Sequence, residues 1–151
     1  GAALEGRFLG KPALAVSLAG ARVKHHTSPQ SFAVAAELVK QLIEHWHELQ
    51  LPSHNIINMN IPDLPLSDIK GHRLTHLGKR QRGLSVDKSH DPRGRAVYWI
   101  GLAGEPMPMK EDTDFYVIEQ GYVSLTPLQT DLTSHEALPP LNDWLQRKRG
   151  V

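Results

Sequence analysis

A strand, a long helix and a second strand follow one another in the first part of this sequence, and this order constrains the fold more than any other feature. Residues 12–18 form a short, nearly continuous apolar run, which is typical of a strand covered on both faces. Apolar residues at three- and four-residue spacings then predict a helix over residues 29–49. Residues 56–61 predict the next strand, which Pro62 closes. Because these elements make a βαβ unit, we expect the two strands to lie parallel.

A polar segment after this unit predicts a projecting hairpin. Residues 79–91 are polar and charged, residues 91–94 carry a turn signal, and residues 96–101 are rich in strand formers. The stretch 101–112 contains several glycine and proline breakers, so we expect an irregular loop there.

Four shorter elements complete the expected order. Residues 72–77 predict a third strand, residues 122–127 a final strand, and residues 138–145 a short helix whose prolines lie in its first turn. Residues 2–5 favour a helix that stops at Gly6. This stub reads either as the last turn of a helix that begins upstream or as a frayed start left by processing or cloning.

The composition limits the class of protein. With 151 residues and 40% hydrophobic content, the chain is long enough to bury a core as one domain. The 17 basic and 16 acidic residues leave a formal charge of +1, which predicts no attraction to nucleic acid or to an anionic membrane. The absence of cysteine suits a reducing compartment, and no apolar stretch approaches the roughly 20 residues that span a bilayer. We therefore expect a cytoplasmic protein.

The nine histidines invite a metal hypothesis, but their spacing does not support one. The close pairs are His25 with His26, His45 with His47, and His72 with His76. The two on the long helix lie two residues apart, so their side chains should point to nearly opposite sides. No pair has a third acidic or histidine ligand at a recognisable offset. The acidic run over residues 111–114 could bind a divalent ion, although we favour a solvated loop followed by a helix cap.

Polar side chains outside any recognised motif are assigned structural roles. Ser17 lacks the first glycine of the G-x-S-x-G elbow, so it predicts no nucleophile. Asn58 and Asn60 project from one face of a strand that otherwise reads as buried, and we expect their amides to bind neighbouring loop backbone. Asp131 and His135 lie four residues apart, which predicts a local ion pair that tethers the last helix. The alternative for this pair is acid/base catalysis, for which the sequence offers no nucleophile or metal cluster.

Several motifs of the chain, taken in order, resemble one enzyme family. The run over residues 113–133, TDFYVIEQGYVSLTPLQTDLT, resembles the C-terminal signature of the stationary-phase survival protein SurE, a family of metal-dependent 5′-nucleotidases. The other similar segments are residues 3–6 with Gly10, residues 12–17, residues 58–62, and residues 91–94 with Tyr98 and Trp99. The resemblance covers essentially all 151 residues.

The resemblance implies an α/β fold, with a partial Rossmann-like, SurE-type three-layer core, a projecting β-hairpin arm and a C-terminal helix. It divides the chain into three parts. Residues 1–78 form the C-terminal half of the α/β core, residues 79–112 form the arm and a loop for subunit association, and residues 113–151 form the final strand and the C-terminal helix. It also implies a homodimer or a homotetramer.

The resemblance further implies a phosphohydrolase of nucleoside 5′- and 3′-monophosphates, in some members also an exopolyphosphatase, that uses a divalent cation such as Mg²⁺ or Mn²⁺. In that family an adjacent Asp-Asp pair near the N-terminus holds the metal together with a later Ser and Asn. A Ser-Gly-Thr phosphate loop comes just before the Ala-Ala-x-Glu-Gly segment. None of these elements precedes residues 2–6 here. We therefore assign no catalytic, metal or substrate-binding residue, and we expect these 151 residues alone to bind no metal and to be inactive.

Two alternatives to this function remain open. The first is a non-catalytic oligomerisation module derived from the same fold, because Tyr98 and Trp99 would need a partner surface if they lie outside the core. The second is a histidine-bound zinc protein.

Overall fold

The computed structural model describes residues 1–19, 29–52, 55–81, 83, 86–101, 104, 107 and 110–148. Its helices are α1 (Ala2–Phe8), α2 (Pro29–Glu44), α3 (Asp114–Glu119) and α4 (Leu138–Arg147), with 3₁₀ turns η1 (Trp46–Glu48), η2 (Leu66–Asp68) and η3 (His135–Ala137). Its strands are β1 (Leu14–Ala19), β2 (Asn55–Pro62), β3 (His72–Leu74), β4 (Asp87–His90), β5 (Ala96–Trp99) and β6 (Val123–Gln129). This mixture of strands and helices confirms the predicted α/β class. The pair His25 and His26 lies outside the described residues.

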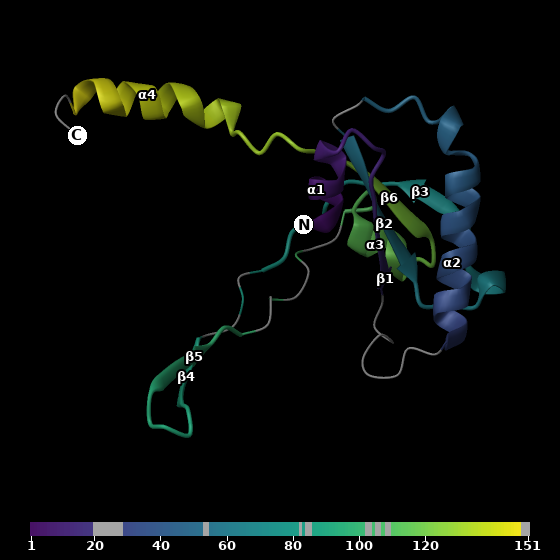
Figure 1. Cartoon of the computed structure of the whole chain (residues 1–151), viewed down its shortest axis with the longest axis horizontal. Coiled ribbons are helices and arrows are strands. Elements are labelled where there is room, and N and C mark those ends of the chain that lie inside the picture. The colour runs from purple at the N-terminus through teal and green to yellow at the C-terminus, as the bar shows by residue number, and fades with distance from the viewer. Residues whose placement is uncertain are drawn as a thin grey trace.

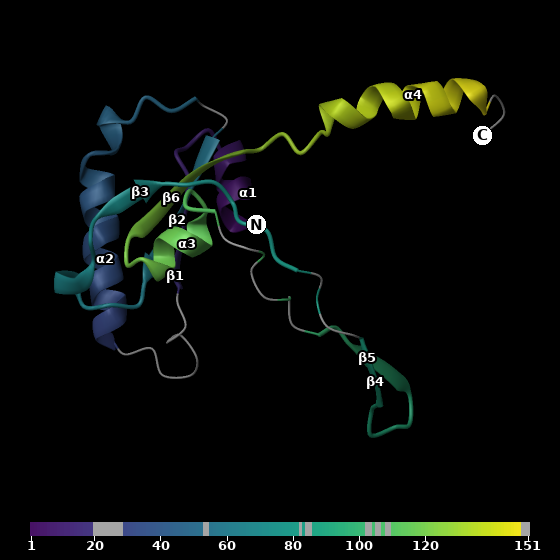
Figure 2. The ribbon, with the colours of Figure 1, turned by 180° about the vertical axis from the view of Figure 1, so that it is seen from behind.

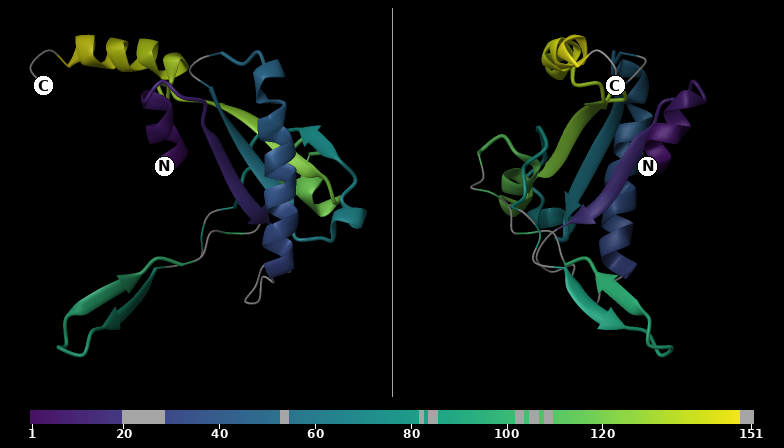
Figure 3. Two further views of the ribbon diagram at one scale, coloured as in Figure 1. Left: turned by 45° about the vertical axis from the view of Figure 1, so that its right-hand side comes forward. Right: turned by 90° about the vertical axis from the view of Figure 1, so that its left-hand side faces the viewer.

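A central sheet joins four strands in the order β1-β2-β6-β3. β1 and β2 are parallel, with Leu14 opposite Ile57, which confirms the predicted βαβ unit. β6 runs antiparallel to β2 and parallel to the short β3. In Figures 1 and 2, α2 lies on one side of this sheet and α1 and α3 lie on the other side, and Figure 3 shows α2 running alongside the strands. The sheet is therefore the middle of three layers, as expected.

The core lies between the sheet and α2. Met59 and Ile61 are two residues apart on β2, so both point to the same face, where they are fully buried with Val123 of β6. Ala35 and Leu38, three residues apart on α2, pack against them. Burying one large apolar side chain of this kind stabilises the fold by about 1.5–3 kcal/mol. This cluster therefore holds the layers together.

Two predicted helix ends are wrong. α2 ends at Glu44, not at residue 49, because η1 takes up the last residues in a tighter turn before the chain becomes extended at Leu49. α1 does not stop at Gly6, since a glycine inside a helix costs only about 1 kcal/mol relative to alanine. It continues to Phe8, and Gly10, with φ of +72°, then reverses the chain.

β3 is shorter than predicted and ends at Leu74, not at residue 77. Thr75 still donates its N–H to the Leu125 carbonyl at 2.9 Å. His76 then forms an isolated bridge with Thr113, just before α3. The strand ends here because the backbone leaves β6 and pairs with this new partner.

Two extensions leave the three layers in different directions (Figures 1 and 2). The arm is the antiparallel hairpin of β4 and β5, and the second extension is α4. In the arm turn the Gly94 N–H donates to the Asp91 carbonyl at 2.9 Å, with Gly94 at φ of +78°. Every residue of β4, β5 and α4 is exposed. The predicted hairpin and C-terminal helix are confirmed, and Tyr98 and Trp99 lie outside the core.

Within the described ranges, no helix is long and apolar enough to cross a bilayer.

Candidate functional site

Polar side chains cross one face of the central sheet. The strand register places Ser17 of β1, Asn60 of β2 and Ser124 of β6 side by side. Asn58 and Thr126 lie opposite each other in the next row. Because residues directly opposite one another point to the same side of a sheet, this face is polar, whereas the face against α2 is apolar.

Ser17 and Asn60 form a direct contact near the carboxyl ends of the two parallel strands. The Ser17 hydroxyl donates a hydrogen bond to Asn60 Oδ1 at 2.5 Å. The prediction that the Asn60 amide binds loop backbone is therefore wrong, because the parallel register puts a hydroxyl directly opposite it. Asn58 is half-buried beside Thr126. Ligands of open α/β sheets bind outside the carboxyl ends of parallel strands. The region around Ser17 and Asn60 is therefore the first candidate for a ligand-binding site.

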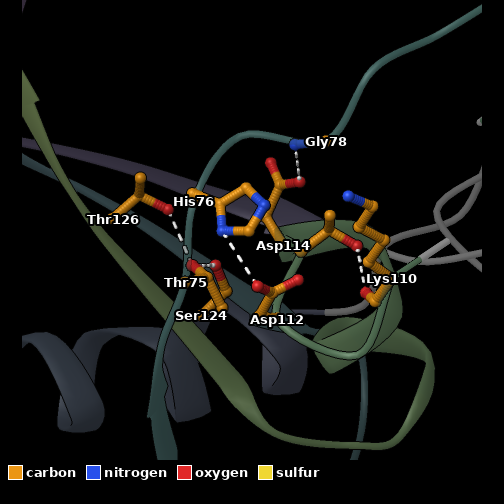
Figure 4. Close-up of polar contacts among 9 residues, drawn as sticks. Thr75, His76, Gly78, Lys110, Asp112, Asp114, Ser124 and Thr126 are labelled. Carbon is orange, nitrogen blue, oxygen red and sulfur yellow. Dashed lines mark hydrogen bonds and ion pairs between the residues drawn. The ribbon is translucent and has the colours of Figure 1, made fainter.

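Three buried hydroxyls join β6 to the chain that leads into the arm. Thr75 Oγ1 lies 2.8 Å from Ser124 Oγ and 2.7 Å from Thr126 Oγ1 (Figure 4). All three residues are buried. Since a hydroxyl can both donate and accept, each of them has a partner inside the group. The cluster fixes the position of the strand that carries the arm.

Two carboxylates fix the point where the arm leaves the sheet. Asp114 Oδ1 accepts hydrogen bonds from the Gly78 N–H at 2.8 Å and from the Phe115 N–H at 2.9 Å (Figure 4). Asp114 is buried, so the prediction of a solvated acidic loop is wrong for this residue. Asp112 is exposed, and its Oδ2 lies 3.5 Å from His76 Nδ1. We call the chain that leads from β3 to the arm the outgoing limb, and the chain that runs from the arm back to α3 the returning limb. Both carboxylates connect the outgoing limb to the end of the returning limb.

Gly78 is required by a close approach to α3. A Cβ atom at this position would lie 2.3 Å from Cδ2 of Phe115 and 3.0 Å from Oδ1 of Asp114. No side chain tolerates the first of these distances, so only glycine lets the outgoing limb lie against the aromatic ring.

The helix α3 was only hinted at by the sequence. Thr113 occupies the N-cap position of α3, as expected, but its side chain accepts no hydrogen bond from a backbone N–H of the helix. Its hydroxyl instead donates to the Lys110 carbonyl at 2.8 Å. The buried Val117 shows that this short helix covers the sheet. The available signal was Thr113 and Asp114 directly ahead of apolar residues at helical spacing.

The expected contact between Asp131 and His135 is present. His135 Nε2 lies 3.0 Å from Asp131 Oδ2, and the Thr133 N–H donates to Asp131 Oδ1 at 2.8 Å. Hydrogen bonds from Thr133, and next from His135, lower the pKa of Asp131 to about 2. Both side chains are exposed and lie in the segment between β6 and α4.

The described residues do not fit a divalent metal ion. Within the described ranges, no group of three or more His, Asp or Glu side chains is arranged to hold one. Of the three acidic residues in the run 111–114, Asp114 is engaged by backbone N–H groups and Asp112 by His76. No catalytic step through a metal follows from these side chains.

The histidines at the end of α2 contact a carboxylate of their own turn. The ring nitrogens of His45 and His47 lie 2.9 Å and 3.9 Å from the same oxygen of Glu48. The prediction that the two side chains point to nearly opposite sides is wrong, because residues 46–48 form a 3₁₀ turn and not a regular helix. All three side chains are exposed, so this is a local surface contact.

The fold and its polar groups define the class of protein. A three-layer domain with parallel strands, polar side chains at their carboxyl ends and two projecting extensions is an α/β domain with a Rossmann-like core. The family model described as "Survival protein SurE" matches residues 1–83. The chain belongs to the SurE family.

Similar proteins cover nearly the whole chain. The chain is 48% identical over 147 residues to a protein of Actinobacillus succinogenes named 5′-nucleotidase SurE, which covers 97% of this chain and 56% of that protein. It is 50% identical over 144 residues to the protein of that name from Aeromonas hydrophila, covering 95% of this chain and 54% of that protein. The crystal structure of the SurE protein from Aquifex aeolicus is 34% identical with a TM-score of 0.63, and the match covers 94% of this chain and 55% of that one. The chain thus spans about half the length of the curated relatives it matches.

Proposed function

We propose that this chain is the carboxyl-terminal portion of a metal-dependent phosphohydrolase of nucleoside 5′- and 3′-monophosphates. The observation that carries the proposal is that nearly the whole chain matches proteins named 5′-nucleotidase SurE at close to half identity. In this proposal residues 1–78 complete the α/β core, residues 79–112 form the arm and its loop, and residues 113–151 supply the final strand and helix.

The contribution of this chain to catalysis is to shape the sheet. β1 is an edge of the described sheet, and Val16 in its middle is 44% exposed, so a further strand can add beside it. Ser17 and Asn60 then lie on the polar face near the carboxyl end of that extended sheet. A bound Mg²⁺ or Mn²⁺ offsets charge on phosphoryl oxygens in such reactions, and the proposal assigns its ligands to the part of the enzyme that these residues do not include. These residues alone are then inactive.

The same proposal assigns the arm and α4 to subunit association in a homodimer or homotetramer. An isolated two-stranded hairpin is at best marginally stable in water, and β5 leaves Tyr98 and Trp99 61% and 65% exposed. α4 also carries exposed apolar side chains, namely Leu138, Leu141, Trp144 and Leu145. A second copy of the chain that covers both extensions removes these side chains from water.

The surroundings of the protein are also part of the proposal. We place it in the cytoplasm, without a nucleic-acid or membrane partner. The near-neutral formal charge of +1 and the absence of cysteine support this placement.

A chimera tests the proposed activity. The 147 matched residues of the Actinobacillus succinogenes relative are replaced by the corresponding residues of this chain. The chimera, the relative and this chain alone are assayed on adenosine 5′-monophosphate with Mn²⁺. We expect the chimera to hydrolyse the nucleotide within about tenfold of the relative, and this chain alone to give no turnover. Metal-dependent turnover by this chain at a rate like that of the relative would contradict the assignment of the metal ligands elsewhere.

A non-catalytic oligomerisation module is the second candidate, because of the exposed Trp99 on the arm. It predicts a chimera that folds and assembles normally by light scattering but hydrolyses no nucleotide. That result would contradict the proposed phosphohydrolase.

A further inference from the structure

A cavity of about 380 Å³ lies at the base of the arm, between the outgoing limb, the returning limb and the start of α3. We call it the arm-base cavity. Its apolar lining includes Leu77, Met107 and Phe115, and its basic lining is His76, Lys79 and Lys110. Its volume falls in the range of small-molecule sites, in which a few polar groups stand beside apolar walls.

The positive charge of the arm-base cavity is not neutralised by the described residues. Neither Lys79 nor Lys110 forms an ion pair with any residue in the described ranges. Of the described carboxylates that follow Lys110 in the chain, Asp112 contacts His76, Asp114 accepts from backbone N–H groups, and Glu111 forms no ion pair with a described residue. Figure 4 shows Lys110 on the segment that also carries Asp112 and leads into α3. Two ammonium groups that have no counter-ion among the described residues therefore line a cavity with apolar walls.

The ring of Phe115 gives the cavity a wall of fixed orientation. The Arg80 guanidinium carbon lies 4.7 Å from the ring centroid, and Arg80 Nη1 donates to the Gly104 carbonyl at 3.3 Å. The backbone of Gly78 approaches the ring edge too closely for any side chain. A ring held in this way loses little freedom when a ligand packs on the part that lines the cavity.

We propose that the arm-base cavity binds a small phosphate monoester with a flat, ring-shaped body. Its phosphate oxygens pair with Lys79 and Lys110, since lysine binds phosphate well as a point charge, and its ring packs on Phe115. Lys79 lies on the outgoing limb and Lys110 on the returning limb, so the ligand ties together two limbs that the Met107 N–H to Lys79 carbonyl bond at 2.9 Å already joins. The site uses neither Ser17 nor Asn60, and it is independent of the proposed hydrolysis.

Phenylphosphonate is the probe, because it carries the ring and the charge of a phosphate monoester but has no ester bond to hydrolyse. In a titration of the chain followed by the NMR signals of backbone amides, we expect saturable shifts at Leu77, Gly78 and Phe115. Lys79→Gln and Lys110→Gln should each weaken binding by about threefold to fivefold, which is the effect of one partly exposed charge pair.

Three controls separate the site from a general attraction to positive charge. Lys88→Gln is the matched variant, because Lys88 also lies beside an aromatic ring, 6.0 Å from the Tyr98 centroid, but on the hairpin itself. It should bind like the unmodified chain. Phe115→Leu should weaken phenylphosphonate by about threefold to tenfold, with its fold checked by thermal unfolding, and inorganic phosphate should bind more weakly than the probe.

The proposal is overturned by any of three results. The first is an absence of saturable shifts at millimolar phenylphosphonate. The second is an equal loss of binding in Lys88→Gln and Lys110→Gln. The third is inorganic phosphate that binds as tightly as the probe, since the ring then contributes nothing. The lysine variants alter exposed side chains, so their result does not depend on whether Phe115→Leu folds.

Discussion

The central sheet and the two extensions of this chain are stabilised in different ways. In the sheet, Met59, Ile61 and Val123 are fully buried beneath α2. In the arm and α4, no residue is buried, although both contain tryptophan. The sheet supports itself by packing, whereas the extensions rely on local hydrogen bonds such as those of the arm turn. The same kinds of side chain thus serve as core in one region and as exposed surface in the other.

Truncation of a buried side chain should separate the two regions most clearly. Met59→Ala should lower the free energy of unfolding by about 2–5 kcal/mol, because it leaves a cavity under α2. Trp99→Ala removes a larger side chain, yet it should change the stability of the isolated chain by no more than about 0.5 kcal/mol. Urea unfolding of both variants measures this. Similar losses for the two would mean that the arm packs on the core in solution.

Glycine positions sharpen the comparison where the arm joins the core. Gly78→Ala should cost about 1–3 kcal/mol, because the new methyl group would overlap Phe115. Gly6→Ala in α1 meets no atom within 4 Å and should stabilise the chain by up to about 1 kcal/mol. Thermal unfolding of the two variants should therefore shift in opposite directions. A neutral Gly78→Ala would show that the arm base is looser than the structure indicates.

Self-association tests the proposed role of the arm. Trp99→Ala should weaken association of the chain by about tenfold or more, since a tryptophan covered by a partner is often a dominant contact. Sedimentation velocity over a concentration series measures this. Phe32→Ala is the control, because Phe32 on α2 is also an exposed aromatic residue, at 60%, but belongs to the layered core. An equal effect of both variants would argue against the arm as the interface.

The contact between Asp131 and His135 should have a smaller effect, confined to the C-terminal segment. His135→Ala should loosen the approach to α4 and change the oligomer distribution seen by light scattering. His47→Ala is the control, since that exposed ring lies 3.9 Å from its nearest carboxylate. Unchanged assembly together with lost metal-dependent hydrolysis in the chimera would indicate a catalytic role for the pair.

Acid should weaken the same tether in a defined range. The folded-state pKa of Asp131, about 2, lies below its ordinary value of 3.8. Its contribution to stability is therefore complete above about pH 4 and is lost as the pH falls through about 2. Hydrogen exchange of the Thr133 amide should accelerate over this range, and Asp131→Asn should abolish the dependence. Exchange that is independent of pH in the unmodified chain, after correction for the intrinsic rate, would contradict the tether.

Local patterns in the sequence predicted the parts of the fold that depend on neighbouring residues. The alternation around Met59 predicted β2, and the turn signal before Gly94 predicted the arm, because both reflect spacing within a few residues. The predicted end of α2 failed because η1 forms where the chain turns toward β2, which no local spacing reports.

The arm base could not be predicted because its contacts join residues far apart in the chain. Asp114 reads as one of several acidic neighbours until its bond to the Gly78 N–H is known. Asn60 reads as a loop-binding amide until the register places Ser17 opposite it. The arm-base cavity likewise needs Lys79 and Lys110 from separate limbs. Each of these contacts depends on how distant parts of the chain are brought together, which cannot be deduced from the spacing of residues in a single sequence.

The length of the arm is only weakly coupled to the stability of the sheet. The arm is inserted between β3 and α3, both of which belong to the three layers. The cost of closing a flexible loop grows only with the logarithm of its length, so even doubling the roughly 40 residues between these two elements would add only about 0.6 kcal/mol. Insertions and deletions in the hairpin should therefore change the free energy of unfolding of the sheet very little. Natural selection can lengthen or shorten the reach of the arm in one lineage after another without rebuilding the layers that carry it.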